Sequence, residues 1–173
     1  MVVRCTRRML ALLGRSVSVV ELPAGGGDDD DDDDDDWYAN LLWLGRRKCL
    51  LLTHAGTLFS IFVPDVRAAE LRPLGPYLAE VIAAALRSEG LPPDALGSLD
   101  SGSLQVARTA SRSVLGFMND MAVHVDYAVA SAGGHSRCDA DTISRQLRRT
   151  PYNRGGYLYP IDLVIKRASA ASK

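Results

Sequence analysis

The chain has 173 residues, of which 47% are hydrophobic and 24% are charged. This composition excludes a disordered chain, and no apolar run approaches the roughly 18 residues that a membrane-spanning helix needs. The formal net charge is −1, but nine acidic residues form one block, Asp28–Asp36. Without these nine, 12 acidic residues stand against 20 basic ones, so the remainder of the chain carries a charge of +8.

The cysteines Cys5, Cys49 and Cys138 have no C-x-x-C spacing. This pattern favours reduced thiols in a cytoplasmic protein over a disulfide framework or a zinc ribbon. We expect no cofactor, and the sequence assigns no metal site.

The N-terminal region begins with a predicted strand, Val2–Cys5, and a short helix, Arg7–Leu13, which Thr6 can cap by accepting a backbone hydrogen bond. Ser16–Leu22 could hold another strand. The Gly/Asp segment 24–36 has nothing apolar to bury and its carboxylates repel one another, so we predict a disordered low-complexity loop there.

The central region predicts an antiparallel meander followed by a helix. Both faces of Trp37–Leu44 are largely apolar, which is typical of a central strand covered on both sides. Cys49–Thr53 is its predicted hairpin partner, and Thr57–Val63 is the third strand. Pro73–Gly90 is then a helix that ends with a glycine followed by an apolar residue and prolines.

The C-terminal half predicts a short strand at Leu104–Thr109, a long helix at Ser113–Ala132 and a helix at Ala140–Arg149 that Asp139 caps. The long helix has an apolar stripe consisting of Val114, Met118, Met121, Val125, Ala128 and Ala132. We expect Tyr157–Ile165 to return to the sheet.

This order of elements predicts an α+β fold, in which three to four helices pack on a small, mainly antiparallel sheet. Residues 1–166 would form a single domain, and residues 167–173 a disordered tail.

One candidate site is the pair Asp120 and His124, which are one helical turn apart and could serve as a catalytic acid/base pair. The alternative is an ordinary surface pair. A metal ion would need a further ligand, for which His54, Asp65 and His135 are the obvious donors.

Two single residues of the long helix are further candidates for contact with a neighbour or a ligand. Gly116 costs about 1 kcal/mol relative to alanine inside a helix, which we interpret as a sign of close packing against a neighbour or ligand. Arg112 could hold an anion together with the free N–H groups at the start of the helix.

A second candidate site combines arginines, which contact phosphate, with tyrosines, which stack on bases, and would suit single-stranded nucleic acid. Its predicted members are Arg145, Arg148, Arg149, Arg154, Tyr152 and Tyr157. The alternative is a solvated helix face with tyrosines covering a sheet edge. Walker A, G-x-G-x-x-G, H-E-x-x-H and G-x-S-x-G patterns are absent from the sequence.

Five segments together resemble the bacterial domain-of-unknown-function family 6933, from Val2 to about Val164. These segments are Val3–Thr6, Trp37–Trp43, Arg46–Thr53, Phe62–Val66 and Ser111–Asp120. The resemblance implies a small, single-domain, cytoplasmic bacterial protein, and it transfers no catalytic residues. The block Asp28–Asp36 departs from the short connection expected there.

The leading functional hypothesis is therefore a non-enzymatic binding or regulatory module, whose basic surface meets nucleic acid or an acidic protein and no membrane. The alternatives are a metal-assisted or acid/base hydrolase that uses Asp120 and His124, and a protein that only assembles with itself or a partner.

Overall fold

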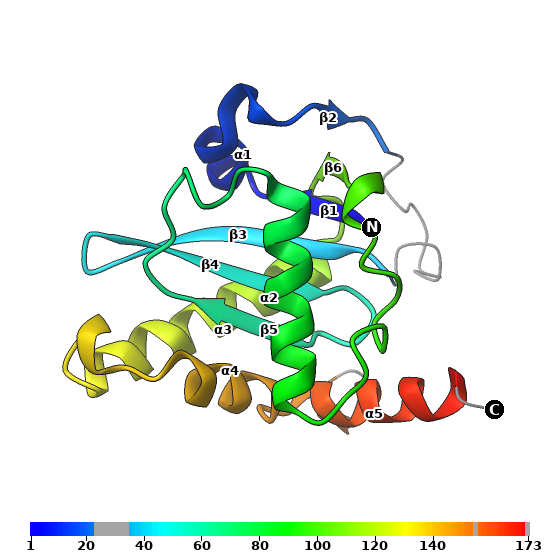
Figure 1. The fold of residues 1–173 in the computed structure, drawn as a ribbon. Coiled ribbons are helices and arrows are strands. Elements are labelled where there is room, and N and C mark those ends of the chain that lie inside the picture. The colour runs from blue at the N-terminus through cyan, green and yellow to red at the C-terminus, as the bar shows by residue number, and fades with distance from the viewer. Residues whose placement is uncertain (23–34, 154–155, 172–173) are drawn as a thin grey trace.

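The computed structural model describes residues 1–22, 35–153 and 156–171 (Figure 1). Most of the predicted acidic loop, residues 24–34, lies outside the described residues, as do Arg154 and residues 172–173 of the predicted tail.

The main sheet is mixed, with the strand order β2-β6-β1-β3-β4-β5. Its strands are β1 (Val2–Cys5), β2 (Val19–Val20), β3 (Trp37–Leu44), β4 (Arg47–His54), β5 (Ser60–Val63) and β6 (Gln105–Arg108). The β3–β4 and β4–β5 pairs are antiparallel, which confirms the predicted meander. Gly45 and Arg46 join β3 to β4, and both have the positive φ angles that a two-residue hairpin turn requires.

The remaining pairs are parallel, so the prediction of a mainly antiparallel sheet is wrong. β1 pairs in parallel with β3 on one side and with β6 on the other, and β2 also runs parallel to β6. The physical reason is the connections: α-helices lie between β1 and β3 and between β5 and β6, and such crossovers return the chain to the end where it started. The coarser prediction, a mixed helix-and-sheet fold, is confirmed.

The α-helices of the described chain are α1 (Arg7–Leu13), α2 (Leu74–Ser88), α3 (Arg112–Ser131), α4 (Ala140–Arg148) and α5 (Pro160–Ala171). Short 3-10 helices cover Gly14–Ser16, Ser101–Ser103 and His135–Arg137. The predicted caps are confirmed: Thr6 accepts a hydrogen bond from Met9 N, and Asp139 accepts one from Asp141 N. After α2, Gly90 has a φ of 71° and the Leu91 amide bonds back into the helix, which is the predicted ending.

The C-terminal segment differs from the prediction. Only Tyr157–Leu158 of the expected strand is extended; it forms β8 and pairs with β7 (Tyr152–Asn153) in a separate two-stranded sheet. Residues 160–171 form α5, so residues 167–171 of the predicted disordered tail are helical. Pro160 suits a first helical position, and Ile161 and Val164, three residues apart, bury themselves in the core.

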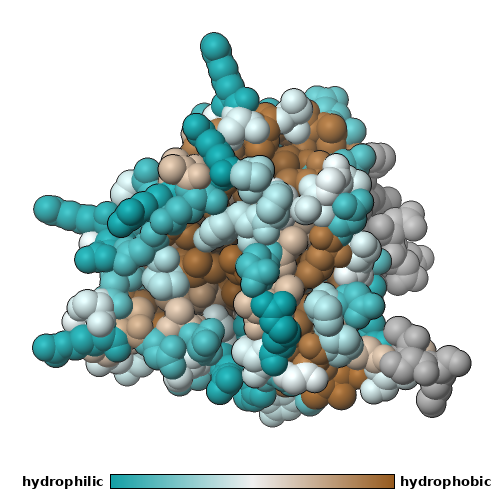
Figure 2. Space-filling view, viewed as in Figure 1, coloured by the Kyte–Doolittle hydropathy of each residue, from teal (hydrophilic) through white to brown (hydrophobic). Residues whose placement is uncertain are grey.

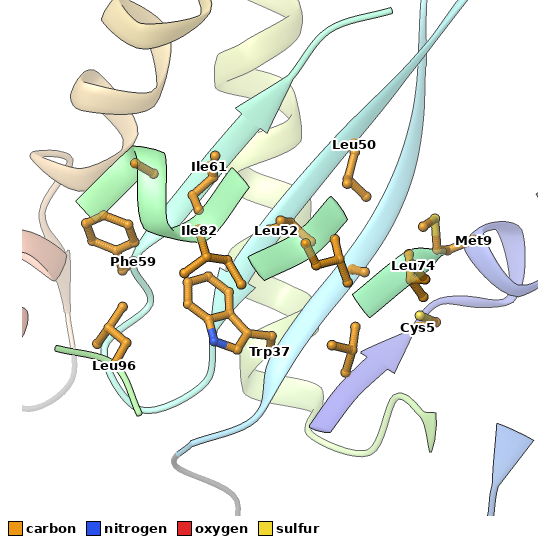
Figure 3. Packing of buried hydrophobic residues seen from close by; sticks show 14 of the residues in the cluster. Cys5, Met9, Trp37, Leu50, Leu52, Phe59, Ile61, Leu74, Ile82 and Leu96 are labelled. Carbon is orange, nitrogen blue, oxygen red and sulfur yellow. The ribbon is translucent and has the colours of Figure 1, made fainter. Parts of the chain in front are cut away.

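Helices cover both faces of the sheet. α2 crosses one face and α3 runs behind the other (Figure 1). Alternate residues of β3 therefore enter two different cores: Trp37 and Ala39 face the α2 side, and Tyr38 and Leu42 face the α3 side. Figure 3 shows Trp37 beside Ile82 of α2 in the first core. The prediction of a central strand with two buried faces is confirmed.

The end of the acidic block belongs to the folded body, contrary to the prediction of a disordered loop through residue 36. The Asp36 carboxylate lies 2.6 Å from Nε of Arg4, whose side chain is only 2% exposed. The Asp36 carbonyl also accepts a hydrogen bond from the Ala55 amide. Asp36 is therefore ordered because it neutralises a buried arginine of the central strand β1.

Side chains of α4 cover the outer edge of β5. Ser144 Oγ accepts a hydrogen bond from the Phe62 amide at 3.0 Å, and Arg148 Nε donates one to the Ser60 carbonyl at 3.1 Å. Ser144 and Arg148 are one helical turn apart, so together they satisfy polar groups that an edge strand otherwise leaves open.

On the face that carries α2, polar side chains project from the surface and apolar residues show between them in patches (Figure 2). None of the helices in the described part of the chain combines the length and the hydropathy that crossing a bilayer requires.

Candidate functional site

A cavity of about 680 Å³ lies against α3, on the side of the sheet away from α2. We call it the α3 cavity. Its apolar lining includes Leu58, Val114, Phe117, Met121 and Val123. Its polar lining includes Tyr38, Ser113, Asp120, His124, Thr150 and Asn153. The cavity thus joins the sheet, one long helix and the segment around β7.

The start of α3 is fixed by local hydrogen bonds. Ser111 is the N-cap, and its hydroxyl accepts a hydrogen bond from Val114 N. The Ser111 amide in turn donates to the Tyr38 hydroxyl at 3.0 Å, which ties the helix to strand β3. Because the buried stripe of α3 faces the sheet, the neighbouring face of the helix lines the cavity.

Asp120 and His124 both line the α3 cavity. Both are exposed, and within the described residues neither side chain forms a hydrogen bond or an ion pair. The carboxylate of Asp120 and the ring nitrogens of His124 are therefore available to a ligand. Their use as a catalytic acid/base pair stays a prediction.

The other metal-ligand candidates lie elsewhere. His54 is fully buried against Trp37, and its Nδ1 is 3.1 Å from the Thr57 hydroxyl. Burial, assisted by the charge of a nearby arginine, lowers the pKa of His54 to about 3, so its imidazole is neutral at physiological pH. Asp65 forms an ion pair with Arg47.

His135 does not line the α3 cavity either: its Nε2 is bonded to the Leu44 carbonyl beside the β3–β4 turn. Across the described ranges, no three His, Cys, Asp or Glu side chains come together as a metal site would require. The metal-assisted version of the hydrolase hypothesis therefore lacks its third ligand among these residues.

The central arginine of the predicted nucleic-acid site is part of the protein interior. Arg148 is 2% exposed, lies 2.9 Å from a Glu89 carboxylate oxygen and stacks over the Phe59 ring at 4.3 Å. Arg149 bonds the second oxygen of the same carboxylate at 2.6 Å. Burial alone would raise the pKa of Glu89, but the hydrogen bonds from Arg149 and Arg148 outweigh it and lower that pKa.

Arg148 therefore cannot reach a phosphate, and its assignment to a nucleic-acid site is wrong. A buried arginine was unexpected because arginine is mostly a surface residue, and its partner Glu89 follows a different helix. Arg145 is exposed and donates to the Ser88 carbonyl.

The tyrosines of the same predicted site have a different position. Tyr152 and Tyr157 line the α3 cavity, and the Tyr152 ring meets the Phe117 ring edge-on at 5.8 Å. Tyr157 is 77% exposed. The structure thus brings parts of the two predicted sites, the acid/base pair and the tyrosines, to one cavity.

The close packing expected at Gly116 is not found, and the anion site expected at Arg112 stays a prediction. Gly116 is exposed, and a Cβ added to it would meet nothing within 4 Å among the described residues, so close packing does not explain the glycine. Arg112 is exposed in the first turn of α3 and is not among the residues that line the cavity.

Comparisons with known proteins concern the whole chain. No curated protein and no solved structure matches it significantly. A family model described as "Domain of unknown function (DUF6933)" matches residues 2–163, nearly the full length. This match confirms the resemblance drawn from the five segments, and the chain belongs to the DUF6933 family.

Proposed function

We propose that the protein is a binding module for a small organic molecule, which it holds in the α3 cavity. The observation that carries this proposal is the cavity itself. Its volume of about 680 Å³ falls within the range of about 300–1,000 Å³ that small-molecule sites occupy. Like such sites, it combines an apolar floor with a few polar groups, of which Asp120 and His124 have no partner within the described protein.

This proposal keeps the class of function expected from the sequence, a binding module, and changes the partner. Two of the four arginines of the predicted nucleic-acid site are engaged within the protein, because Arg148 is buried and Arg149 is bonded to Glu89. The lining of the α3 cavity, within the described residues, includes the carboxylate of Asp120 and no Lys or Arg. We therefore propose a small molecule in place of nucleic acid or an acidic protein.

Obstruction of the cavity tests the proposal. Val123 lines the cavity and is 70% exposed, so Val123→Trp should narrow the mouth without disturbing the core. Ala130 is also exposed on α3, two helical turns further along the same face and outside the cavity, so Ala130→Trp is the matched control.

A fragment library screened by ligand-observed NMR should yield compounds that bind the wild type and Ala130→Trp and bind Val123→Trp at least ten-fold more weakly. A screen in which no compound distinguishes the two tryptophan variants would contradict the proposal.

A second candidate is acid/base catalysis in the same cavity, favoured by the shared lining position of Asp120 and His124. A positioned general base contributes about 10²–10⁴-fold to a rate. Hydrolysis of p-nitrophenyl esters, phosphates or glycosides should then fall by about that factor in His124→Asn. Equal rates for the wild type and His124→Asn across the panel would refute this candidate.

A further inference from the structure

We infer that the α3 cavity selects an organic cation, in which a flat ring is joined to a positively charged amine. This inference rests on the proposed function, because it names the class of ligand for the same cavity. It follows from the charge of the lining and from the rings that surround it.

The charge of the lining favours a cation. Asp120 supplies a carboxylate that has no hydrogen bond or ion pair within the described protein, and no Lys or Arg shares the described lining. Asp120 is the only Asp or Glu among the described residues that line the cavity. An anionic ligand would face the negative charge of Asp120, whereas an amine would form a charge-assisted hydrogen bond with it.

The aromatic groups favour the same ligand. Phe117 precedes Asp120 by three residues, so the ring and the carboxylate project from neighbouring positions on α3. Tyr152 meets Phe117 at an interplanar angle of 70°, and Tyr157 presents a largely exposed ring at the cavity. The faces of such rings attract an amine cation, and they also bury a flat apolar group. One small molecule can use both features only if it carries a ring and an amine together.

The decisive comparison uses three probes with the same ring and nearly the same length: tyramine, tyrosol and 4-hydroxyphenylacetate. They carry a positive charge, no charge and a negative charge in the same place. Isothermal titration at neutral pH and fixed ionic strength should rank tyramine first by about ten-fold or more, then tyrosol, then the carboxylate.

Asp120→Asn should reduce the preference for tyramine over tyrosol to less than about two-fold, since it removes the charge and keeps the size of the side chain. Asp126→Asn is the matched control: it removes the same charge from an exposed residue of the same helix that does not line the cavity. His124→Gln should also retain the preference, because the selectivity resides in the carboxylate.

The outcomes separate this inference from the proposed function. Equal affinity for the three probes, or no binding of any of them, overturns the inference while library compounds sensitive to Val123→Trp still support the proposed function. A preference that survives Asp120→Asn also overturns it. If the probes bind but Val123→Trp does not weaken them, they bind outside the cavity, which also overturns the inference. The proposed function fails only if no library compound distinguishes Val123→Trp from Ala130→Trp.

Discussion

The last two residues of the acidic block differ in what they contact, and this difference predicts different costs for the same substitution. Asp36 pairs with Arg4, and the two side chains are 11% and 2% exposed. Asp35 pairs with Arg167, and these side chains are 66% and 35% exposed. Asp35→Asn and Asp36→Asn remove one charge each from adjacent positions, so any general effect of the acidic block on stability is the same in both.

The expected magnitudes follow from burial. Removing one partner of a buried pair costs about 3–5 kcal/mol, because the other charge stays buried and loses that partner. The amide introduced by Asp36→Asn would keep an oxygen acceptor for Arg4, so we expect the lower end, about 3 kcal/mol, or a melting temperature roughly 6–12 °C lower. Asp35→Asn should cost less than about 1 kcal/mol, as is usual for an exposed pair.

Urea denaturation followed by far-UV circular dichroism at pH 7.5 measures both variants by linear extrapolation. Arg4→Met in the Asp36→Asn background removes the buried charge that has lost the Asp36 carboxylate, so the double variant should be more stable than Asp36→Asn alone. Equal losses for the two single variants, or a cost below about 1 kcal/mol for Asp36→Asn, would refute the reasoning.

Three further predictions concern glycine positions and buried titratable groups. Gly116→Ala should stabilise the protein by about 0.5–1 kcal/mol, because the added methyl group meets open space. Gly75→Ala should destabilise it, because the new Cβ would lie 2.6 Å from the Ser101 carbonyl oxygen. Between pH 7.5 and pH 5 the free energy of unfolding of the wild type should fall by about 2 kcal/mol because of His54. In this range the unfolded imidazole (pKa 6.5) takes up a proton, whereas the folded one (pKa about 3) does not. His54→Gln should remove this loss of stability. Glu89→Gln should lower the free energy of unfolding by about 3 kcal/mol at neutral pH, and this difference should shrink below pH 4.5. The pKa of Glu89 is lowered in the folded protein, so its carboxylate stops contributing to stability as the pH falls through that folded pKa.

Urea titrations across pH check all three. The free energy of unfolding should rise in Gly116→Ala and fall in Gly75→Ala. A fall in both variants would contradict the interpretation of Gly116. A wild-type stability that stays constant between pH 7.5 and pH 5 would show that His54 is protonated in the folded state. A cost for Glu89→Gln that grows toward acidic pH would contradict the direction of the pKa shift.

The elements that could be predicted from the sequence are those whose signals are local. Thr6, Asp139 and Gly90 each mark a helix boundary through bonds to residues a few positions away. The alternation in Trp37–Leu44 likewise reports both buried faces of β3. These predictions hold because caps, turns and side-chain periodicity depend on neighbouring residues.

The features that escaped prediction depend on distant residues. The pairing of β1 with β6 joins segments about a hundred positions apart, and four-residue strands carry too little pattern to specify a partner. Arg148 could be assigned to the interior only by knowing that Glu89 lies beside it. Asp36 was indistinguishable from its eight neighbours, because identical residues give no sign of which one meets Arg4.

The same holds for the candidate site. The one-turn spacing of Asp120 and His124 placed them together on a helix face, but the sequence could not show that Tyr152 and Tyr157 complete a cavity around them. The rings reach the cavity because β7 and β8 pair with each other apart from the main sheet. Nothing in their own sequence pattern specifies that position.

The position of α4 over the edge of β5 has a consequence for the newly made chain. Ser144 follows Phe62 by 82 residues, so at a synthesis rate of about 5–20 residues per second the edge of β5 waits roughly 4–16 s for its helix. During that interval an apolar strand with unpaired amides can recruit a strand from another nascent chain. Variants that weaken α4, such as Ser144→Ala, should therefore reduce the soluble yield at high expression rates more than their equilibrium stability suggests.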